Sequence, residues 1–335
     1  MAAPSLSRIA VLGAGAWGTA LAVTARRAGC DVSLWARAPG VAAGIAATRE
    51  NARRLPGISL DPDIAVTADM DAALAGAGAV LMAVPMAAVR VTAASLAGAL
   101  RPGVPVTMCA KGIEPGSGLF PAEIVAGLLP EAPVAVLSGP TFAAEVAAGK
   151  PTAVTLACRE EAIAAALATA LGSDSFRPYS TSDVVGVETG GALKNVLAIA
   201  CGIVAGRRLG ENARAALIAR GLAEMTRLAV ALGGRAETVA GLSGLGDVAL
   251  SCTSPTSRNY ALGLALGEGL PLAEAAARSR GVTEGVATSA AVVTRAQAAG
   301  VELPVAEAVA GILAGTLPID TAIARLLARP LRREA

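Results

Sequence analysis

One lysine stands in an otherwise apolar stretch of the sequence, where a charged side chain needs a reason. Residues 191–205 read GALKNVLAIACGIVA and predict a largely buried helix around Lys194. The chain has only three lysines, Lys111, Lys150 and Lys194, beside 25 arginines. Burial in an apolar environment lowers the pKa of a lysine towards the range in which it exchanges protons. In the alternative reading, the lysine stem crosses the apolar layer and its amine reaches water.

A glycine-rich turn near the start of the chain is typical of dinucleotide binding. Residues 13–18, GAGAWG, match GxGxxG directly after an apolar run and directly before a predicted helix over 19–28. Gly13 permits the tight turn, Gly15 lets a pyrophosphate approach the backbone, and Gly18 lets the helix pack on the strand. The helix N-terminus offers free N–H groups to the phosphates. A tight turn without a ligand is the alternative.

The end of the second apolar run indicates which nucleotide is bound. NAD sites tend to place an acidic residue there, against the ribose 2′-hydroxyl. Here the run ends in Arg37, and Asp31 lies too early to serve. Arg37 can pair with a 2′-phosphate, so we expect NADP(H), without strict exclusion of NAD(H). The alternative for Arg37 is a solvated surface arginine.

A nicotinamide enzyme that reduces a ketone must also protonate its oxygen, and few residues here can do so. The chain has no histidine, which argues against His-dependent dehydrogenases and removes a usual zinc ligand. Tyr179 and Tyr260 are the only tyrosines, and neither begins a Tyr-x-x-x-Lys pattern. Lys194 is therefore the leading candidate, whereas Lys150 looks like a loop cation with no special role. We expect no metal site.

The other candidate site residues lie in predicted loops after strands and in one polar segment. Ligands of an open α/β sheet gather beyond the carboxyl ends of the strands, where Lys111 follows a strand end. Gly139 allows close backbone approach, and Thr141 can cap a predicted helix over 142–148 or bind an anion at its N-terminus.

The polar segment, residues 241–259, reads GLSGLGDVALSCTSPTSRN and suits an anion cradle. Arg258 can grip a phosphate or carboxylate with two donors. Asp247 could hold a substrate hydroxyl or orient the lysine. Taken alone, the segment could equally be a capped loop between two helices.

These residues need elements of two kinds to position them. Apolar runs alternate with helix-length segments in the first half, which predicts right-handed βαβ units and an α/β Rossmann-type N-terminal domain with a mostly parallel sheet, residues 1–185. An all-α C-terminal domain for substrate binding and catalysis, residues 186–335, is expected to follow. The predicted strands are 9–15, 31–37, 79–85, 105–112, 133–140 and 152–158, and the predicted helices of the second half are 188–205, 211–232, 235–241, 258–268, 271–279, 284–299, 304–315 and 318–328.

Composition excludes several classes of protein. The net charge of +2 and the absence of a basic cluster with aromatics argue against nucleic-acid binding. An apolar strand pattern begins at residue 8, so we expect no signal peptide. The uncharged run 72–89 is long enough for a membrane helix, but Pro85 breaks it, and we read it as helix end, turn and buried strand. Widely spaced cysteines without a CxxC pair favour a reduced, cytoplasmic setting; they are Cys30, Cys109, Cys158, Cys201 and Cys252.

Seven segments in order along nearly the whole chain resemble the bacterial-type NAD(P)-dependent glycerol-3-phosphate dehydrogenases. They are GAGAWGTALA (13–22), AKGIE (110–114), SGPTFAAEVAAGKPTA (138–153), GGALKNVLAIA (190–200), ARAALIARGLAEM (213–225), GLGDVALSCTSPTSRN (244–259) and VTEG (282–285). The resemblance implies reversible reduction of dihydroxyacetone phosphate to sn-glycerol 3-phosphate, feeding phospholipid synthesis, by a homodimer without membrane insertion.

The same resemblance assigns residues to roles. Lys194 would be the proton-transfer group. The substrate would be lined by Lys111, Gly139, Thr141, Lys194, Asp247, Ser257, Arg258 and Asn259. Beside the three glycines Gly13, Gly15 and Gly18, the cofactor would be contacted by Ala16, Trp17, Arg37, Lys111, Ala143, Arg258, Val282 and Glu284.

Two alternatives stay open from the sequence. A ketopantoate or 3-hydroxyacid-type NADP-dependent reductase shares the domain plan and the catalytic lysine, but its carboxylate substrate needs fewer donors than the serine-rich segment before Asn259 offers. A non-catalytic NADPH sensor would not need Lys111, Lys194 and Asp247 together.

Overall fold

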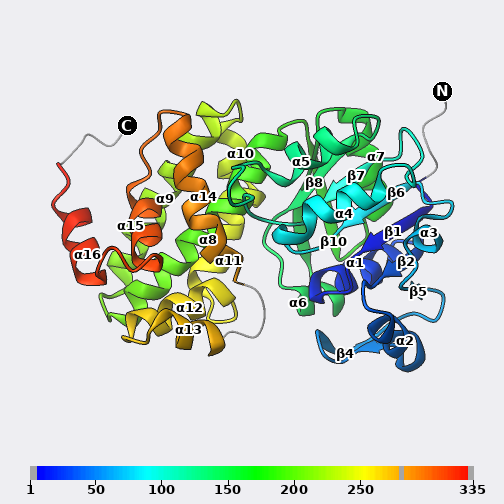
Figure 1. Ribbon diagram of the computed structural model, residues 1–335, viewed down its shortest axis with the longest axis horizontal. Coiled ribbons are helices and arrows are strands. Elements are labelled where there is room, and N and C mark those ends of the chain that lie inside the picture. Colours follow the sequence, from blue (N-terminus) through cyan, green and yellow to red (C-terminus); the bar gives the residue numbers. More distant parts are fainter. Residues whose placement is uncertain (1–5, 279–282, 331–335) are drawn as a thin grey trace.

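The computed structural model describes residues 6–278 and 283–330, which form a half with the sheet and a half made of helices (Figure 1). In the described residues every strand lies between Arg8 and Thr181, and the long helix α8 (Val184–Gly206) opens the helical half. The boundary expected at residue 185 falls in the first turn of this helix. The arrangement is the predicted α/β domain followed by a helical domain.

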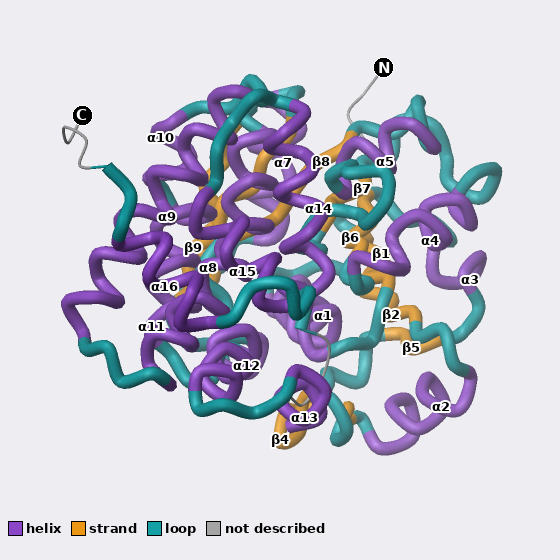
Figure 2. The backbone as a smooth tube through the Cα atoms, turned by 60° about the vertical axis from the view of Figure 1, so that its left-hand side comes forward, coloured by secondary structure: helices purple, strands orange, loops and turns teal. Residues whose placement is uncertain are grey.

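The sheet has eight strands in the order β10-β9-β8-β7-β6-β1-β2-β5, and Figure 2 shows β6, β1, β2 and β5 following one another along it. Neighbouring strands run parallel except β8 and β9, which are antiparallel with Ser138 opposite Thr155. Residues of the central strands are buried on both faces, which explains their continuous apolar runs. The strands are β1 (Arg8–Leu12), β2 (Asp31–Trp35), β5 (Ala65–Thr67), β6 (Ala79–Met82), β7 (Val106–Met108), β8 (Val134–Ser138), β9 (Thr152–Cys158) and β10 (Phe176–Thr181).

Helices cover both faces of the sheet and enclose two apolar cores. One core contains Leu21 of α1 and Leu167 of α7, and the other contains Leu96 of α4 and Val125 of α5. A two-stranded hairpin, β3 (Glu50–Asn51) with β4 (Leu55–Ser59), lies outside the sheet. The helices of this half are α1 (Ala16–Arg27), α2 (Pro39–Thr48), α3 (Met70–Leu74), the 3₁₀ turn η1 (Met86–Ala88), α4 (Val89–Leu96), α5 (Pro121–Leu128), α6 (Ala143–Ala147) and α7 (Glu161–Leu171).

The helical half is built around α8, which is the one described helix long and apolar enough to cross a membrane. Of its most apolar window, 78% is buried inside the structure, so packing within the protein accounts for its composition. The glycines of α8 and α12 let the two helices touch: a Cβ at Gly263 would lie 2.0 Å from the Ile199 carbonyl oxygen. Around α8 are α9 (Glu211–Ala231), α10 (Ala236–Ala240), the π-helical turn η2 (Leu242–Gly246), α11 (Asp247–Thr253), α12 (Arg258–Gly267), α13 (Leu272–Arg278), α14 (Glu284–Ala298), α15 (Pro304–Leu313) and α16 (Ile319–Leu327).

The structure adds to or differs from the sequence patterns at three places. Residues 242–253 form η2 and α11 rather than a loop, because Val248 and Cys252 face the core of the helical half. The connection from β8 to β9 is no βαβ unit, since the five-residue α6 is too short to carry the chain back for a parallel pairing. Strand β10 was missed because it lies at the sheet edge, where Arg177 and Tyr179 can be polar or exposed.

Candidate functional site

The glycine-rich turn links β1 to α1 with the geometry that its glycines predict. Gly13 has φ +111° and donates its N–H to the Trp35 carbonyl at 3.0 Å, which ties the turn to the end of β2. A Cβ at Gly18 would lie 1.8 Å from the Gly13 carbonyl oxygen, so only glycine lets the helix start this close to the strand. The turn therefore delivers the N-terminus of α1 to the carboxyl end of the sheet.

The residues around the turn fit the phosphates of a dinucleotide. Gly15 is the N-cap of α1, and a Cβ built there would meet nothing within 4 Å. The indole nitrogen of Trp17 is buried without a hydrogen-bond partner. Open space beside the free N–H groups of a helix start is what a pyrophosphate requires.

Four of the other expected cofactor residues, Ala16, Trp17, Arg37 and Ala143, lie around the same turn, whereas Lys111, Arg258 and Glu284 lie elsewhere. Arg37 is exposed, two residues beyond the Trp35 carbonyl that holds Gly13. Ala16, Trp17 and Ala143 pack against one small apolar cluster between α1 and α6. Val282 lies outside the described residues.

The centre of the second site is Asp247, which holds both candidate lysines. Its carboxylate is 1% exposed and accepts from Lys111 Nζ at 2.6 Å through Oδ2 and from Lys194 Nζ at 3.0 Å through Oδ1. Lys111 also donates to the Gly139 carbonyl at 2.9 Å, and Lys194 to Ser251 Oγ at 2.9 Å. The Lys194 amine thus ends on polar partners beside the sheet edge, and the reading in which it simply reaches water is wrong.

Burial and charge act in opposite directions at this cluster. Burial alone would raise the pKa of the Asp247 carboxyl, but the two ammonium groups outweigh it and hold that pKa below its usual range. Burial lowers the pKa of Lys111, although Asp247 works against the shift. With one carboxylate between two lysines, the cluster can offer a net positive charge to an anionic ligand.

A hydrogen bond between two asparagines joins the start of α12 to α8 next to Lys194. Asn259 Nδ2 donates to Asn195 Oδ1 at 2.9 Å, and its Oδ1 accepts from the Gly285 N–H at 3.1 Å. Each asparagine follows a candidate cation, Lys194 or the exposed Arg258. Ser257 is the N-cap of α12 and accepts from the Tyr260 N–H.

The loop after β8 differs from one expectation. Gly139 has φ +147°, and its carbonyl accepts from both Lys111 Nζ and the Thr141 hydroxyl, the latter at 3.2 Å. Thr141 does not cap α6, whose N-cap is Phe142 without a side-chain hydrogen bond. The expected helix over 142–148 is shorter in the structure, where α6 spans Ala143–Ala147.

Glu284 connects the two halves of the molecule. Its Oε1 accepts from the Met86 N–H at 3.3 Å, which joins α14 to the turn after β6. Burial raises the pKa of this carboxyl, and the Met86 N–H bond and the positive Arg258 partly offset the shift.

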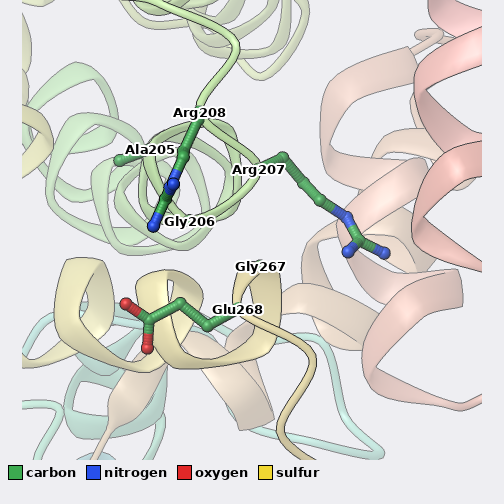
Figure 3. Close-up of a pocket in the computed structure, with 6 residues that line it drawn as sticks. All are labelled: Ala205, Gly206, Arg207, Arg208, Gly267 and Glu268. Atoms are coloured by element: carbon green, nitrogen blue, oxygen red, sulfur yellow. The ribbon is translucent and has the colours of Figure 1, made fainter.

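The structure has two cavities to consider: one lies away from the lysine–aspartate cluster, and the other is too small for a substrate. One of about 430 Å³ lies at the C-terminal ends of α8 and α12, where Figure 3 shows Arg207 pointing away from Arg208 and Glu268. It lies roughly 20 Å along α8 from Lys194. The second, about 10 Å³, lies beside the Lys111 stem next to Ser138 and Glu188, and has room for one water.

The structure also reveals polar residues that the sequence alone did not single out. Ser251 donates to Asp247 Oδ1 at 3.2 Å while accepting from Lys194. Their i, i+4 spacing was a usable signal once the segment was known to be helical. Asn51 contacts the glycine-rich turn from a hairpin that no pattern predicted.

Known glycerol-3-phosphate dehydrogenases are similar to this chain over nearly its whole length. Two protein-family models match. The family model for the NAD-dependent glycerol-3-phosphate dehydrogenase N-terminus matches residues 8–164, and the family model for the C-terminus matches residues 183–324. The glycerol-3-phosphate dehydrogenase (NAD(P)+) of Rhodospirillum rubrum is 57% identical, with 98% of this chain and 94% of the relative covered. That of Caulobacter vibrioides is 54% identical over 99% of this chain and 100% of the relative. A crystal structure of glycerol-3-phosphate dehydrogenase from Coxiella burnetii superposes with a TM-score of 0.92 at 40% identity, covering 96% of this chain and 99% of the other.

Proposed function

The chain belongs to the NAD-dependent glycerol-3-phosphate dehydrogenase family, and from this premise we propose how it catalyses the reversible NAD(P)H-dependent reduction of dihydroxyacetone phosphate to sn-glycerol 3-phosphate. The observation that carries the assignment is the buried Asp247 carboxylate with a lysine on each oxygen. A reductase of a phosphorylated ketone needs a proton donor and positive charge at the same place. This cluster supplies both.

The cofactor is held by the sheet half. The free N–H groups at the start of α1 bind its pyrophosphate in the open space at Gly15. Arg37, exposed beyond β2, pairs with the 2′-phosphate of NADP(H), while the absence of a carboxylate at that point leaves NAD(H) acceptable. The substrate phosphate lies at the N-terminus of α12, where Ser257, Arg258 and Asn259 provide donors.

The lysine–aspartate cluster performs the proton transfer. When bound, NAD(P)H supplies the hydride for the ketone carbon. Lys194 Nζ donates its proton to the developing alkoxide, and in the reverse direction it takes the proton from the substrate hydroxyl. Lys111 remains as a fixed positive charge that stabilises the negative oxygen in a water-poor site. Asp247 orients both amines, and Ser251 accepts a second hydrogen bond from the Lys194 amine, which further fixes its orientation.

A substrate assay tests this function against its nearest rival. Purified protein should oxidise NADPH with dihydroxyacetone phosphate and much more slowly with a panel of 2-keto acids that includes ketopantoate. The phosphate is the reason, because the serine-rich start of α12 offers more donors than a carboxylate needs. Turnover of a keto acid in preference to dihydroxyacetone phosphate would show that the substrate has been misassigned.

We propose the setting of the enzyme on the same premise. Residues 1–185 bind the cofactor, residues 186–335 bind the substrate and complete catalysis, and two copies form a homodimer in the cytoplasm, supplying glycerophospholipid synthesis. The five cysteines are free and buried, which suits a reducing compartment. Light scattering coupled to size-exclusion chromatography tests the dimer: a monomeric mass at micromolar concentration would contradict it.

A further inference from the structure

A buried side chain from outside the sheet touches the glycine-rich turn. Asn51, in the hairpin β3–β4, is 3% exposed. Its Nδ2 donates to the Ala14 carbonyl at 3.0 Å and to Thr19 Oγ1 at 2.8 Å. One amide therefore binds the middle of the turn and the first part of α1 together.

The hairpin that carries Asn51 is itself fixed against the cofactor side of the sheet half. Leu55 of β4 is buried with Ala20 of α1 and Ala147 of α6. The Arg54 N–H closes the hairpin on the Asn51 carbonyl at 3.0 Å. Figure 1 shows β4 beneath α1 and α6, at the bottom of the sheet half. Asn51 is thus a rigid donor rather than a side chain on a free loop.

The bond to Ala14 determines which way the next N–H points. In a trans peptide the C=O and the following N–H point in opposite directions. With its oxygen held by Asn51, the Ala14–Gly15 peptide turns the Gly15 N–H away from the hairpin. A flipped peptide would instead present a carbonyl oxygen to the phosphates, which repels an anion.

We propose that Asn51 is a positioning residue of the cofactor site, which holds the Ala14–Gly15 peptide in the orientation that binds the pyrophosphate. The proposal rests on the proposed function only in taking the ligand of this turn to be NAD(P)H. The bond to Thr19 keeps the start of α1 in register with the turn. Asn51 touches neither substrate nor lysine cluster, so it acts on cofactor affinity alone.

The test compares Asn51→Leu with a matched control on the same helix. Thr24→Val removes a buried side-chain bond to the Ala20 carbonyl, 2.8 Å long, one turn further along α1. We expect Asn51→Leu to raise the Kd and KM for NADPH about 10-fold, the effect of one to two hydrogen bonds. The kcat at saturating NADPH and the KM for dihydroxyacetone phosphate should stay at wild-type values. Thr24→Val should leave the Kd and KM for NADPH, the kcat and the KM for dihydroxyacetone phosphate unchanged.

A second measurement needs no cofactor. The Gly13 and Thr19 N–H groups are hydrogen-bonded to the carbonyls of Trp35 and Gly15. Their amide hydrogen exchange in the free protein should be about 10-fold faster in Asn51→Leu than in Thr24→Val, because the turn is no longer held. If Asn51→Leu does not fold, Thr19→Val removes one of the two bonds. It should weaken NADPH binding and speed amide exchange in the same direction, by a smaller factor.

The outcomes separate this proposal from the function on which it rests. Wild-type protein without NADPH binding would refute the proposed function, while the exchange rates would still decide whether Asn51 holds the turn. Wild-type-like NADPH affinity and exchange in Asn51→Leu and Thr19→Val would overturn the positioning role. Equal losses in Asn51→Leu and Thr24→Val would also overturn it, since they would reflect helix stability alone.

Discussion

At the scale of single residues, the chemistry depends on a carboxylate shared by two amines. A buried carboxylate that loses its partners carries an uncompensated charge, so Asp247 and the lysines form one unit. Because the two oxygens serve different lysines, each amine has its own direction. The unit therefore divides the work, with one fixed charge and one proton carrier.

Lys194→Ala should bind NADPH nearly normally but lose at least ~10²-fold in kcat, since it removes the proton donor. Lys194→Arg should be nearly as inactive, because a guanidinium keeps its proton. The exposed Lys150, paired with Glu145, provides the control, and Lys150→Ala should keep wild-type kcat. Steady-state kinetics with dihydroxyacetone phosphate check this. Near-normal turnover of Lys194→Ala would rule out the catalytic assignment.

Arg37→Asp should weaken NADPH binding by about 10- to 100-fold, the effect of losing charge-assisted bonds to the 2′-phosphate, while NADH binding changes far less. The control is Arg159→Asp. Arg159 is also exposed, but it follows the antiparallel β9 and so lies at the opposite edge of the sheet. Titrations with both nucleotides measure the effect. Equal loss of NADPH and NADH would mean that Arg37 does not touch the 2′-phosphate.

Much of the residue-level site could be predicted, because scarcity was informative. With no histidine and three lysines, few residues could carry the proton, and the structure brings Lys111, Lys194 and Asp247 together. Asn51 could not be predicted, since a single asparagine in a short hairpin has no periodic signal. Its significance lies in a contact with a turn 37 residues earlier.

At the scale of elements, two buried glutamates cap helices that are distant in sequence. Glu188 accepts from the Ala122 N–H at 2.8 Å at the start of α5, and Glu224 accepts from the Val305 N–H at 2.8 Å at the start of α15. Burial raises the pKa of Glu188 to about 8 and that of Glu224 to about 7. The N–H bonds at the two helix starts favour the ionised carboxylates, but burial outweighs them, so the folded protein as a whole is most stable when these carboxyls keep their protons.

The free energy of unfolding should consequently fall as pH rises. The folded-state pKa lies above the unfolded value, so this contribution is complete below about pH 4.5 and is lost as pH rises through about 7 to 8. Urea denaturation at pH 6 and pH 8.5 should show a smaller fall in Glu188→Gln than in wild type. The exposed Glu131→Gln should match wild type. An unchanged fall in Glu188→Gln would contradict this account.

The contact of α8 with α12 is another property of elements. Gly263→Val should destabilise the protein by about 3 kcal/mol, at the upper end for overpacking, because backbone atoms of α8 must move. Gly127→Ala in α5 is the control: a Cβ there meets nothing within 4 Å. That change should stabilise by about 0.5–1 kcal/mol. Similar stability of Gly263→Val and wild type, measured by urea denaturation, would argue against the close packing.

Elements were predictable where periodicity was strong and not where it was weak. Central strands such as β6 and long helices such as α9 stand close to their expected bounds, because β6 is buried throughout and α9 alternates buried and exposed residues with helical spacing. The edge strand β10 and the π-turn η2 depend on neighbours that no local pattern contains.

At the scale of the whole molecule, the site exists only because the two halves meet. Lys111 belongs to the sheet half, whereas Lys194 and Asp247 belong to the helical half. Helix α14 adds further links, since Arg295 donates to Glu123 at 2.7 Å and lies over the Phe120 ring. Helix α14 is therefore one of the elements that hold the halves together.

NADPH at 100 times its Kd should raise the free energy of unfolding by about 2.7 kcal/mol, because it binds only the folded protein. Since contacts cross between the halves, thermal unfolding should show a single transition that shifts as a whole. Calorimetry with and without NADPH measures this. Two transitions, of which NADPH moves only one, would show that the halves unfold independently.

The reversed strand β9 has a consequence for chain length. Because β9 and β10 run against the other strands, the chain leaves β10 at the edge of the sheet opposite the ligands. The ten steps from Val184 to Lys194 then rise about 15 Å along α8, close to the length of a five-residue strand. Gly191 accordingly comes level with Ser138, at the ligand edge. The number of residues in the first turns of α8 therefore sets where Lys194 lies. One residue inserted there would rotate Lys194 by about 100° away from Asp247.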